Sequence, residues 1–304
     1  MSGTMGDVRA TEPASPFAGV LSERRRRRIA WAMRAAFVVA LVLFTILRPI
    51  QAGDAHAYWS VDITDPYIRP VATQDAFTYP PPAALFFSVL GQLPYQVFEA
   101  IWTLLIGAAL LWLAGPWALP ILLIPVVASD VYLGNIHVLL AASIVASLRW
   151  PSLWFVPLLT KPSCGVGLLW YAARGEWRRL AKAIGVTGAI VVASAVIAPT
   201  LWPKWVGYVL GTGFAPDVGT AYSIPISLLI RLPAAVLLVI WGARTNRPWT
   251  LPTASMLALP VLWLVGLAML AGAFALSPIG PLRGFGRRWG GRSDVSGTAG
   301  GAST

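Results

Sequence analysis

Long apolar runs, each bounded by polar or basic residues, constrain this chain more than any other feature. The first run covers Ile29 to Leu47, and Arg34 is its one charged residue. A bilayer core about 30 Å thick requires about 20 mostly apolar residues per helical span. Only 12% of the residues are charged, against about 25% in a soluble domain. The sequence therefore predicts an all-α integral membrane protein, a polytopic helix bundle with about eight or nine membrane elements.

The basic residues indicate how the chain is oriented. Residues 1–28 are predicted to form a disordered basic tail, because the first part is rich in Ser, Gly, Pro and Thr without apolar periodicity. Arg24 to Arg28 follow, and the positive-inside rule then places the N-terminus in the cytoplasm. No A-x-A-like cleavage site follows Leu47, so the first run is interpreted as an uncleaved span. We expect a multi-pass protein of the cytoplasmic membrane.

Residues 29–276 are predicted to form one membrane domain, with external loops at 48–80 and 202–225. The runs at 81–93 and 117–129 are short for a full crossing, so each is tilted, re-entrant or buried among other helices. Five crossings, or three crossings with a re-entrant pair, would both deliver the basic segment 174–182 to the cytoplasm. Both alternatives stay open.

The basic, low-complexity tail at residues 277–304 is difficult to place. Counting Leu251 to Leu276 as one span puts this tail outside, yet it carries Arg283 and three further arginines. Either a span has been miscounted, or the chain ends where a longer protein would continue.

Composition excludes several classes of protein. The net charge of +11 does not indicate nucleic-acid binding, because the arginines flank apolar runs and do not interleave with aromatic residues. The single cysteine, Cys164, excludes an internal disulfide, and the two histidines, His56 and His137, lack metal-ligand spacing. We therefore expect no metal ion and no cofactor. A soluble nucleotide-sugar enzyme is disfavoured because no Gly-rich phosphate loop is present.

The predicted loop 48–80 gathers carboxylates directly after the first span. Asp62 and Asp65 are interpreted as solvated loop residues. Asp54 lies at the membrane boundary, where a carboxylate can meet both an aqueous acceptor and a lipid-borne donor. With an ordinary pKa near 3.9, it is ionised at neutral pH and can act as a general base. Tyr58 lies four residues on, so the two side chains share a face if the segment is helical.

Several short patterns, taken in order, resemble glycosyltransferase family 87, whose multispan GT-C members use polyprenyl-phosphate sugars. The loop supplies D-x-x-x-Y as "DAHAY", Asp-x-Tyr as "DPY" and "FTYPP" at Phe77 to Pro81. Looser matches are "GNIH" at Gly134 to His137, "KP" at Lys161, and "SIPISLLIR", which ends at Arg231. After "LSPI" at Leu276 to Ile279 the sequence departs from the family, so the chain looks C-terminally truncated or shifted in frame.

The resemblance implies transfer of a hexose, first of all mannose, from a polyprenyl-phosphate donor to a lipid or glycan acceptor at the outer face. Asp54 is the expected base, and Lys161 and Arg231 are candidates to stabilise the leaving phosphate. The further expected substrate-binding residues are Tyr58, Asp75, Tyr79, Asn135 and His137. Membrane lipids would surround the protein.

Each role has a structural alternative. Asn135 and His137 can simply bridge helices, and the tyrosines can belong to an interfacial belt. Arg231 can snorkel near a span end, and Lys161 can pair with a carboxylate. The competing function is a non-catalytic membrane protein, either an inactive truncated relative or a transporter.

Overall fold

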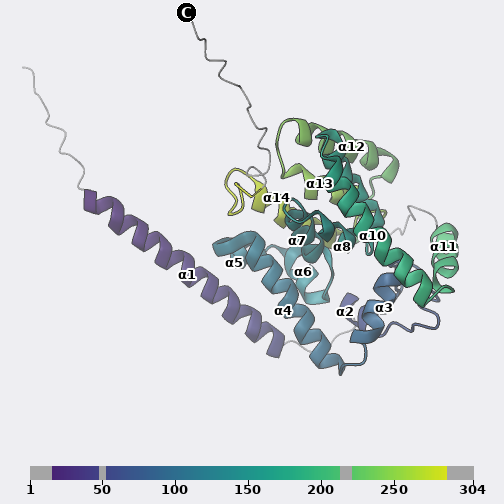
Figure 1. Cartoon of the computed structure of the whole chain (residues 1–304). Coiled ribbons are helices and arrows are strands. Elements are labelled where there is room, and N and C mark those ends of the chain that lie inside the picture. The colour runs from purple at the N-terminus through teal and green to yellow at the C-terminus, as the bar shows by residue number, and fades with distance from the viewer. Residues whose placement is uncertain (1–15, 48–52, 213–220, 286–304) are drawn as a thin grey trace, which may run out of the picture.

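The computed structural model describes residues 16–47, 53–212 and 221–285, and these residues form helices joined by turns (Figure 1). The described residues contain no strand beyond one isolated bridge between Ser223 and Trp263. The α-helices are α1 Pro16–Leu47, α2 Asp54–Trp59, α3 Pro81–Leu90, α4 Tyr95–Ala114, α5 Ala118–Leu122, α6 Pro125–Leu133, α7 His137–Ser147, α8 Phe155–Leu158, α9 Leu169–Ala173, α10 Trp177–Ile197, α11 Leu201–Thr212, α12 Leu228–Arg244, α13 Thr250–Leu257 and α14 Leu270–Leu276. Short 3-10 helices are η1 Gly115–Trp117, η2 Pro151–Trp154, η3 Pro162–Leu168 and η4 Leu264–Met269. The all-α prediction is confirmed.

Three stretches of helix are long and apolar enough to cross a membrane: Ser22–Leu47, Tyr95–Leu122 and Trp177–Ile197. Helices α6 and α7 together would make a fourth crossing, although they are bent by 101° at the break between them. Helix α3 is shorter but also apolar, and it contacts α10. The membrane class of the protein is thus confirmed, while the predicted eight or nine elements include segments too short to span alone.

Helix α1 begins earlier than the sequence analysis predicts. It starts at Pro16 rather than Ile29, so residues 16–28 of the predicted disordered tail are helical. An i,i+4 ion pair, with Arg27 Nη2 at 2.6 Å from Glu23 Oε1, supports this part of the helix. Residues 1–15 lie outside the described residues.

One end of the molecule holds α2, which begins at Asp54, and the start of α4 at Tyr95. It is here called the acidic end. The ring of His56 in α2 lies 5.2 Å from that of Tyr95 at the start of α4. Helix α11, in the first part of the predicted loop 202–225, joins the same end, because Lys204 Nζ donates to the Thr64 carbonyl at 2.8 Å. The two predicted loops thus contain helices and contact each other.

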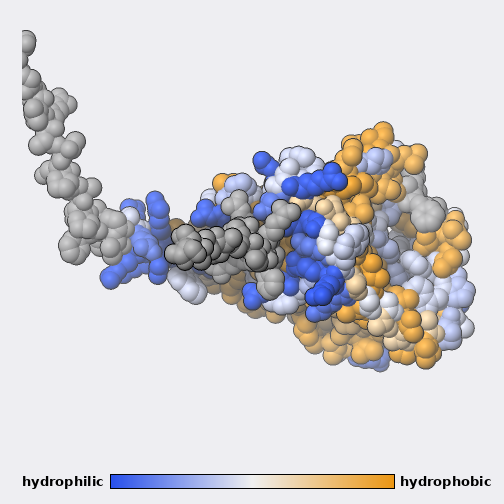
Figure 2. All heavy atoms as spheres, turned by 45° about the horizontal axis from the view of Figure 1, so that its top comes forward, coloured by the Kyte–Doolittle hydropathy of each residue, from blue (hydrophilic) through white to orange (hydrophobic). Residues whose placement is uncertain are grey.

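The opposite end, here called the basic end, gathers arginines from distant parts of the chain. Gly115, directly after α4, adjoins both Arg34 of α1 and Pro281. Arg174 Nη1 donates to the carbonyl of Ala243 in α12 at 3.1 Å. Figure 2 shows hydrophilic side chains gathered beside hydrophobic surface when the top of Figure 1 is tilted forward. Arg34 and Arg174, which are far apart in the sequence, therefore both lie at this end.

The apolar stretch at residues 152–173 forms a hairpin that turns back on itself. Its two legs contact each other, because Trp154 Nε1 donates to Tyr171 Oη at 3.3 Å. Tyr171 Oη in turn donates to the Ser147 carbonyl at 2.6 Å, at the basic end. Lys161 lies between the two legs, with its Nζ 5.2 Å from the ring centre of Tyr79. The chain thus enters from the basic end, reaches Tyr79 at Lys161 and returns.

The apolar stretch 251–276 also makes two passes rather than one. Helix α13 leads from the basic end to Leu259, whose carbonyl accepts from Arg231 Nη1 at 2.7 Å. The chain turns at 260–263, where Ile224 N donates to the Leu262 carbonyl, and returns through η4 and α14. Phe285 then packs on Trp150, with ring centres 6.5 Å apart. Residues 277–285, including Arg283, therefore lie at the basic end.

Candidate functional site

Helix α2 carries Asp54 on its first turn and Tyr58 one turn later, as the D-x-x-x-Y spacing predicts. Gly53 caps the helix in close contact with the backbone of Leu133, where a side chain would clash. This contact places α2 directly over the break between α6 and α7. Asp54 is half-buried and Tyr58 is fully buried.

The break itself presents Asn135 to Asp54. Gly134 ends α6 in the left-handed region, at φ +67°, a conformation that glycine adopts without strain. Asn135 then follows, and its Nδ2 donates to Asp54 Oδ2 at 2.7 Å. Asn135 Oδ1 accepts from the backbone N–H of Ile136 at 2.7 Å, which fixes the amide orientation. The two residues of the predicted site therefore meet across 81 positions of sequence.

Burial and the neighbouring groups shift the pKa of Asp54 in opposite directions. Burial raises the pKa of this carboxyl above its ordinary value, and the Lys161 ammonium, His137 and the Asn135 hydrogen bond lower it against that larger effect. A raised pKa makes a carboxylate a stronger base. Lys161 is half-buried at the tip of the 152–173 hairpin, so a cation and a base lie together at the acidic end.

The name Asp54 cluster is used here for Asp54, Tyr58, Tyr79, Asn135 and Lys161. Its two tyrosines form one wall. The hydroxyl oxygens of Tyr58 and Tyr79 are 2.9 Å apart, and Tyr67 Oη donates to the Tyr79 carbonyl at 3.0 Å. Burial raises the pKa of both Tyr58 and Tyr79, so both remain neutral hydrogen-bonding groups. Lys161 lies over the Tyr79 ring, an arrangement that favours a cation.

Asp130 also belongs to this region, although no sequence pattern points to it. It is fully buried in α6, and its Oδ1 lies 2.9 Å from His137 Nδ1. Its Oδ2 accepts from the Val138 N–H at 3.2 Å, so the carboxylate holds both the imidazole and the first turn of α7. His137 Nε2 is buried without a hydrogen-bond partner in the described part of the chain. An acidic residue inside an apolar run was the available signal.

Asp75 lies away from the Asp54 cluster. Its Oδ1 is 2.7 Å from His56 Nδ1, and its Oδ2 is 3.0 Å from Arg69 Nη1. These contacts tie the loop 69–75 to α2. A substrate-binding role for Asp75 stays a prediction, and its observed contacts position His56.

Arg231 is buried in α12 and directs its guanidinium at backbone carbonyls. Nε donates to Ile226, and Nη1 and Nη2 donate to the turn after α13, at Leu257, Leu259 and Pro260, over distances of 2.7 to 2.9 Å. A guanidinium has five N–H donors, so these four bonds leave one for a ligand. The described contacts do not include Asp54 or Lys161, and a phosphate-binding role stays a prediction.

An apolar cavity of about 500 Å³ adjoins the cluster. Phe87 and Trp102 line it, and the same two rings pack on Tyr58, with centres 4.8 and 5.6 Å from the Tyr58 ring. Ile136 and Thr160 also line it, and each is a sequence neighbour of a cluster residue. The polar cluster therefore lies beside a hydrophobic cavity of a size that holds small ligands.

The arrangement is a membrane helix bundle with a half-buried base, a cation and neutral hydroxyls at one end. The sequence profile of glycosyltransferase family 87 matches residues 77–286, which are 210 of the 304 residues. The chain belongs to glycosyltransferase family 87. No curated protein and no solved structure matches it. The matched range begins at Phe77 and includes Tyr79, Asn135, His137, Lys161 and Arg231, whereas Asp54 and Tyr58 precede it.

Metal ligands do not gather in the described residues: no group of three His, Cys, Asp or Glu side chains could hold an ion. The absence of a metal remains an expectation for the whole chain.

Proposed function

We propose that this glycosyltransferase moves a hexose, mannose in the first instance, from a polyprenyl-phosphate donor to a hydroxyl of a lipid or glycan acceptor. The observation that carries the proposal is the Asp54 cluster beside the apolar cavity. A polyprenyl-phosphate sugar has a polar head and an apolar chain. Such a ligand needs a polar binding site directly beside an apolar one. Membrane helices with a cavity among them suit a donor that arrives from the bilayer.

Asp54 acts as the general base in this proposal. The acceptor oxygen attacks C1 of the donor sugar, its proton passes to Asp54, and the bond between C1 and the phosphate oxygen breaks. The electron pair leaves with the polyprenyl phosphate. A single displacement of this kind inverts the configuration at C1. Asn135 holds the carboxylate in one orientation through its 2.7 Å hydrogen bond.

Lys161 stabilises the departing phosphate. Its ammonium is close enough to Asp54 and Tyr79 to lower the pKa of both groups, so negative charge that develops there meets a cation. Such electrostatic stabilisation of a developing charge is usually a large part of catalysis. Tyr58 and Tyr79, which stay neutral, contribute hydroxyls and ring faces for the sugar.

In this proposal, the basic end lies on the cytoplasmic side of the cell membrane. The positive-inside rule applies to arginines that the fold gathers at one end, such as Arg34, Arg149 and Arg174. The Asp54 cluster then lies toward the outer face, where lipid-linked sugars rather than nucleotides would serve as donors.

The test is sugar transfer by the purified chain in liposomes, with a labelled polyprenyl-phosphate mannose and membrane lipid acceptors. Asp54→Asn should lower the rate about 10² to 10⁴-fold, the usual contribution of a general base, and Asp62→Asn, an exposed loop carboxylate, is the matched control. An unchanged rate in Asp54→Asn would remove it as the base. Failure of the inserted parent chain with every polyprenyl-linked sugar would favour an inactive relative, and donor uptake without transfer would favour a transporter.

A further inference from the structure

The basic end contains a second cavity, and no residue of the Asp54 cluster lines it. It has a volume of about 520 Å³ and is lined by Arg247, Arg283, Asn246, Trp249, Leu276 and Pro278, among others. It lies between the turn after α12 and the segment after α14. Residues separated by 36 positions, Arg247 and Arg283, thus supply two cations to one cavity.

The charge in this cavity is not compensated by the described residues. No carboxylate lines it, and neither Arg247 nor Arg283 forms an ion pair within residues 16–47, 53–212 and 221–285. Arg247 stacks on Trp241, with its guanidinium carbon 5.4 Å from the ring centre. This stacking supports the cation without consuming its hydrogen-bonding edge.

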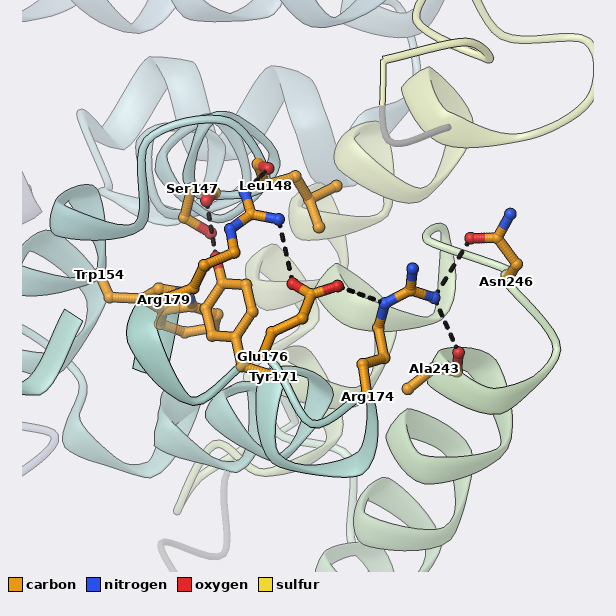
Figure 3. Close-up of polar contacts among 9 residues, drawn as sticks. All are labelled: Ser147, Leu148, Trp154, Tyr171, Arg174, Glu176, Arg179, Ala243 and Asn246. Atoms are coloured by element: carbon orange, nitrogen blue, oxygen red, sulfur yellow. Dashed lines mark hydrogen bonds and ion pairs between the residues drawn. The ribbon is translucent and has the colours of Figure 1, made fainter. Parts of the chain in front are cut away.

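The carboxylate of Glu176 is already occupied, as Figure 3 shows. Glu176 Oε1 accepts from Arg174 Nε at 2.7 Å, and its Oε2 accepts from Arg179 Nη1 at 3.0 Å. Arg174 also bonds to Asn246 Oδ1, at 3.4 Å, so this network reaches the wall of the cavity. Because Glu176 is held by two arginines, it offers no charge to Arg247 or Arg283. Within the described residues, no carboxylate therefore balances the charge of Arg247 and Arg283.

We propose that this cavity binds the phosphate of an anionic phospholipid headgroup. Arginine guanidinium groups match phosphate oxygens in pairs, which fits the two cations. Trp249, Leu276 and Pro278 add an apolar part to the wall, and they suit the glycerol and upper acyl region of a lipid better than a free ion. Anionic lipids are also concentrated in the leaflet that basic segments face.

Binding can be measured on the full purified chain in neutral detergent, without sugar donor or acceptor. Phosphatidylglycerol, phosphatidylcholine and inorganic phosphate are titrated separately, and bound ligand is counted by native mass spectrometry. We expect phosphatidylglycerol to bind most tightly. Arg247→Gln and Arg283→Gln should each weaken this binding about fivefold, and higher salt should weaken it in the parent chain.

Arg149→Gln is the matched control. Arg149 is also exposed at the basic end and stacks on Trp150 at 5.0 Å, but it does not line the cavity. Unchanged phosphatidylglycerol binding in the Arg247 and Arg283 double variant would overturn the proposal, as would an equal loss in Arg149→Gln. If inorganic phosphate bound as tightly as the lipid, the lipid assignment would be overturned in favour of a soluble phosphate. Melting temperatures without lipid would show that the variants fold.

Discussion

Asn135 Nδ2 donates a 2.7 Å hydrogen bond to Asp54 Oδ2, and this contact joins the start of α2 to the break between α6 and α7. The bond stabilises the ionised carboxylate and so lowers the pKa of Asp54, as Lys161 does to a greater extent. Burial has the larger, opposite effect. His137 also lowers this pKa and Asp130 raises it, so the effect of removing Lys161 or Asn135 is predictable in sign.

The pH dependence of transfer should move when either neighbour is removed. Since Asp54 must be ionised to act as a base, the rate should rise with pH through its raised pKa. Lys161→Met and Asn135→Ala each remove an influence that lowers this pKa, so both should move the acidic limb of the rate profile to higher pH. The shift should be larger for Lys161→Met.

Rate profiles from about pH 4 to 9, with Arg149→Gln as the control, would check this order. A limb that moved to lower pH in Lys161→Met would contradict the assignment of Asp54 as the titrating base. A lower rate without any shift would mean that Lys161 acts on the phosphate alone.

The stability of the fold should respond to Asp54 with the opposite sign from that of an ordinary salt-bridged carboxylate. Below an ordinary Asp pKa of 3.8, the group is protonated in both the folded and the unfolded chain. As pH rises toward the raised folded pKa, only the unfolded chain releases the proton, so stability falls. Above the folded-state pKa, the free energy of unfolding falls no further and stays at this lower value.

Asp54→Asn removes this titration and should therefore melt at a temperature equal to or above that of the parent chain at pH 7. At about pH 4 the two melting temperatures should converge. Thermal unfolding in detergent at both pH values measures the effect. A variant that melted lower at pH 7 would show that the ionised carboxylate stabilises the bundle through Lys161.

Arg231→Gln should destabilise the protein more than it changes donor binding. The guanidinium donates to four carbonyls, and each buried acceptor left without a partner costs about 1 to 3 kcal/mol. We expect a clear loss of thermal stability, with donor and acceptor use falling together. Arg244→Gln, an exposed arginine on the same helix, should have little effect. A raised donor KM at unchanged stability would instead assign Arg231 to the phosphate.

Asp130→Asn should weaken the region around His137. The buried carboxylate accepts from His137 Nδ1 and from the Val138 N–H, and an amide has only one acceptor oxygen for both. We expect a loss of about 1 to 3 kcal/mol in the free energy of unfolding, together with slower transfer. Chemical unfolding of the variant beside Asp62→Asn would measure this loss, and equal stabilities would contradict the role assigned to Asp130.

The sequence predicted the helical membrane class and most members of the Asp54 cluster. Asp54, Tyr58, Tyr79, Asn135 and Lys161 were recognisable because they form short patterns in a fixed order. Which of them touch depends on helix breaks, and the left-handed turn at Gly134 is one that hydropathy does not reveal. Asp130 was missed because it belongs to no pattern, although a carboxylate in an apolar run has to be paired.

The number of passes was harder to predict for a physical reason. An apolar run of sufficient length fits one straight span or two short legs equally well, because both bury the same side chains. At residues 152–173 and 251–276 the chain uses two legs. In the first hairpin the legs contact each other through Trp154 and Tyr171. In the second, Arg231 of α12 binds the carbonyls of the turn. Such turns depend on partners from other helices.

The hairpin that carries Lys161 has a consequence for how the protein is made. Asp54, Asn135 and Lys161 all belong to the first 161 residues, so the ribosome completes the polar cluster before it synthesises α10 to α14. The free-energy cost of inserting a cation at a hairpin tip is lower if a carboxylate is already present to pair with it. The order of the chain thus lets Asp54 act as a docking partner for Lys161 during insertion, long before any sugar binds.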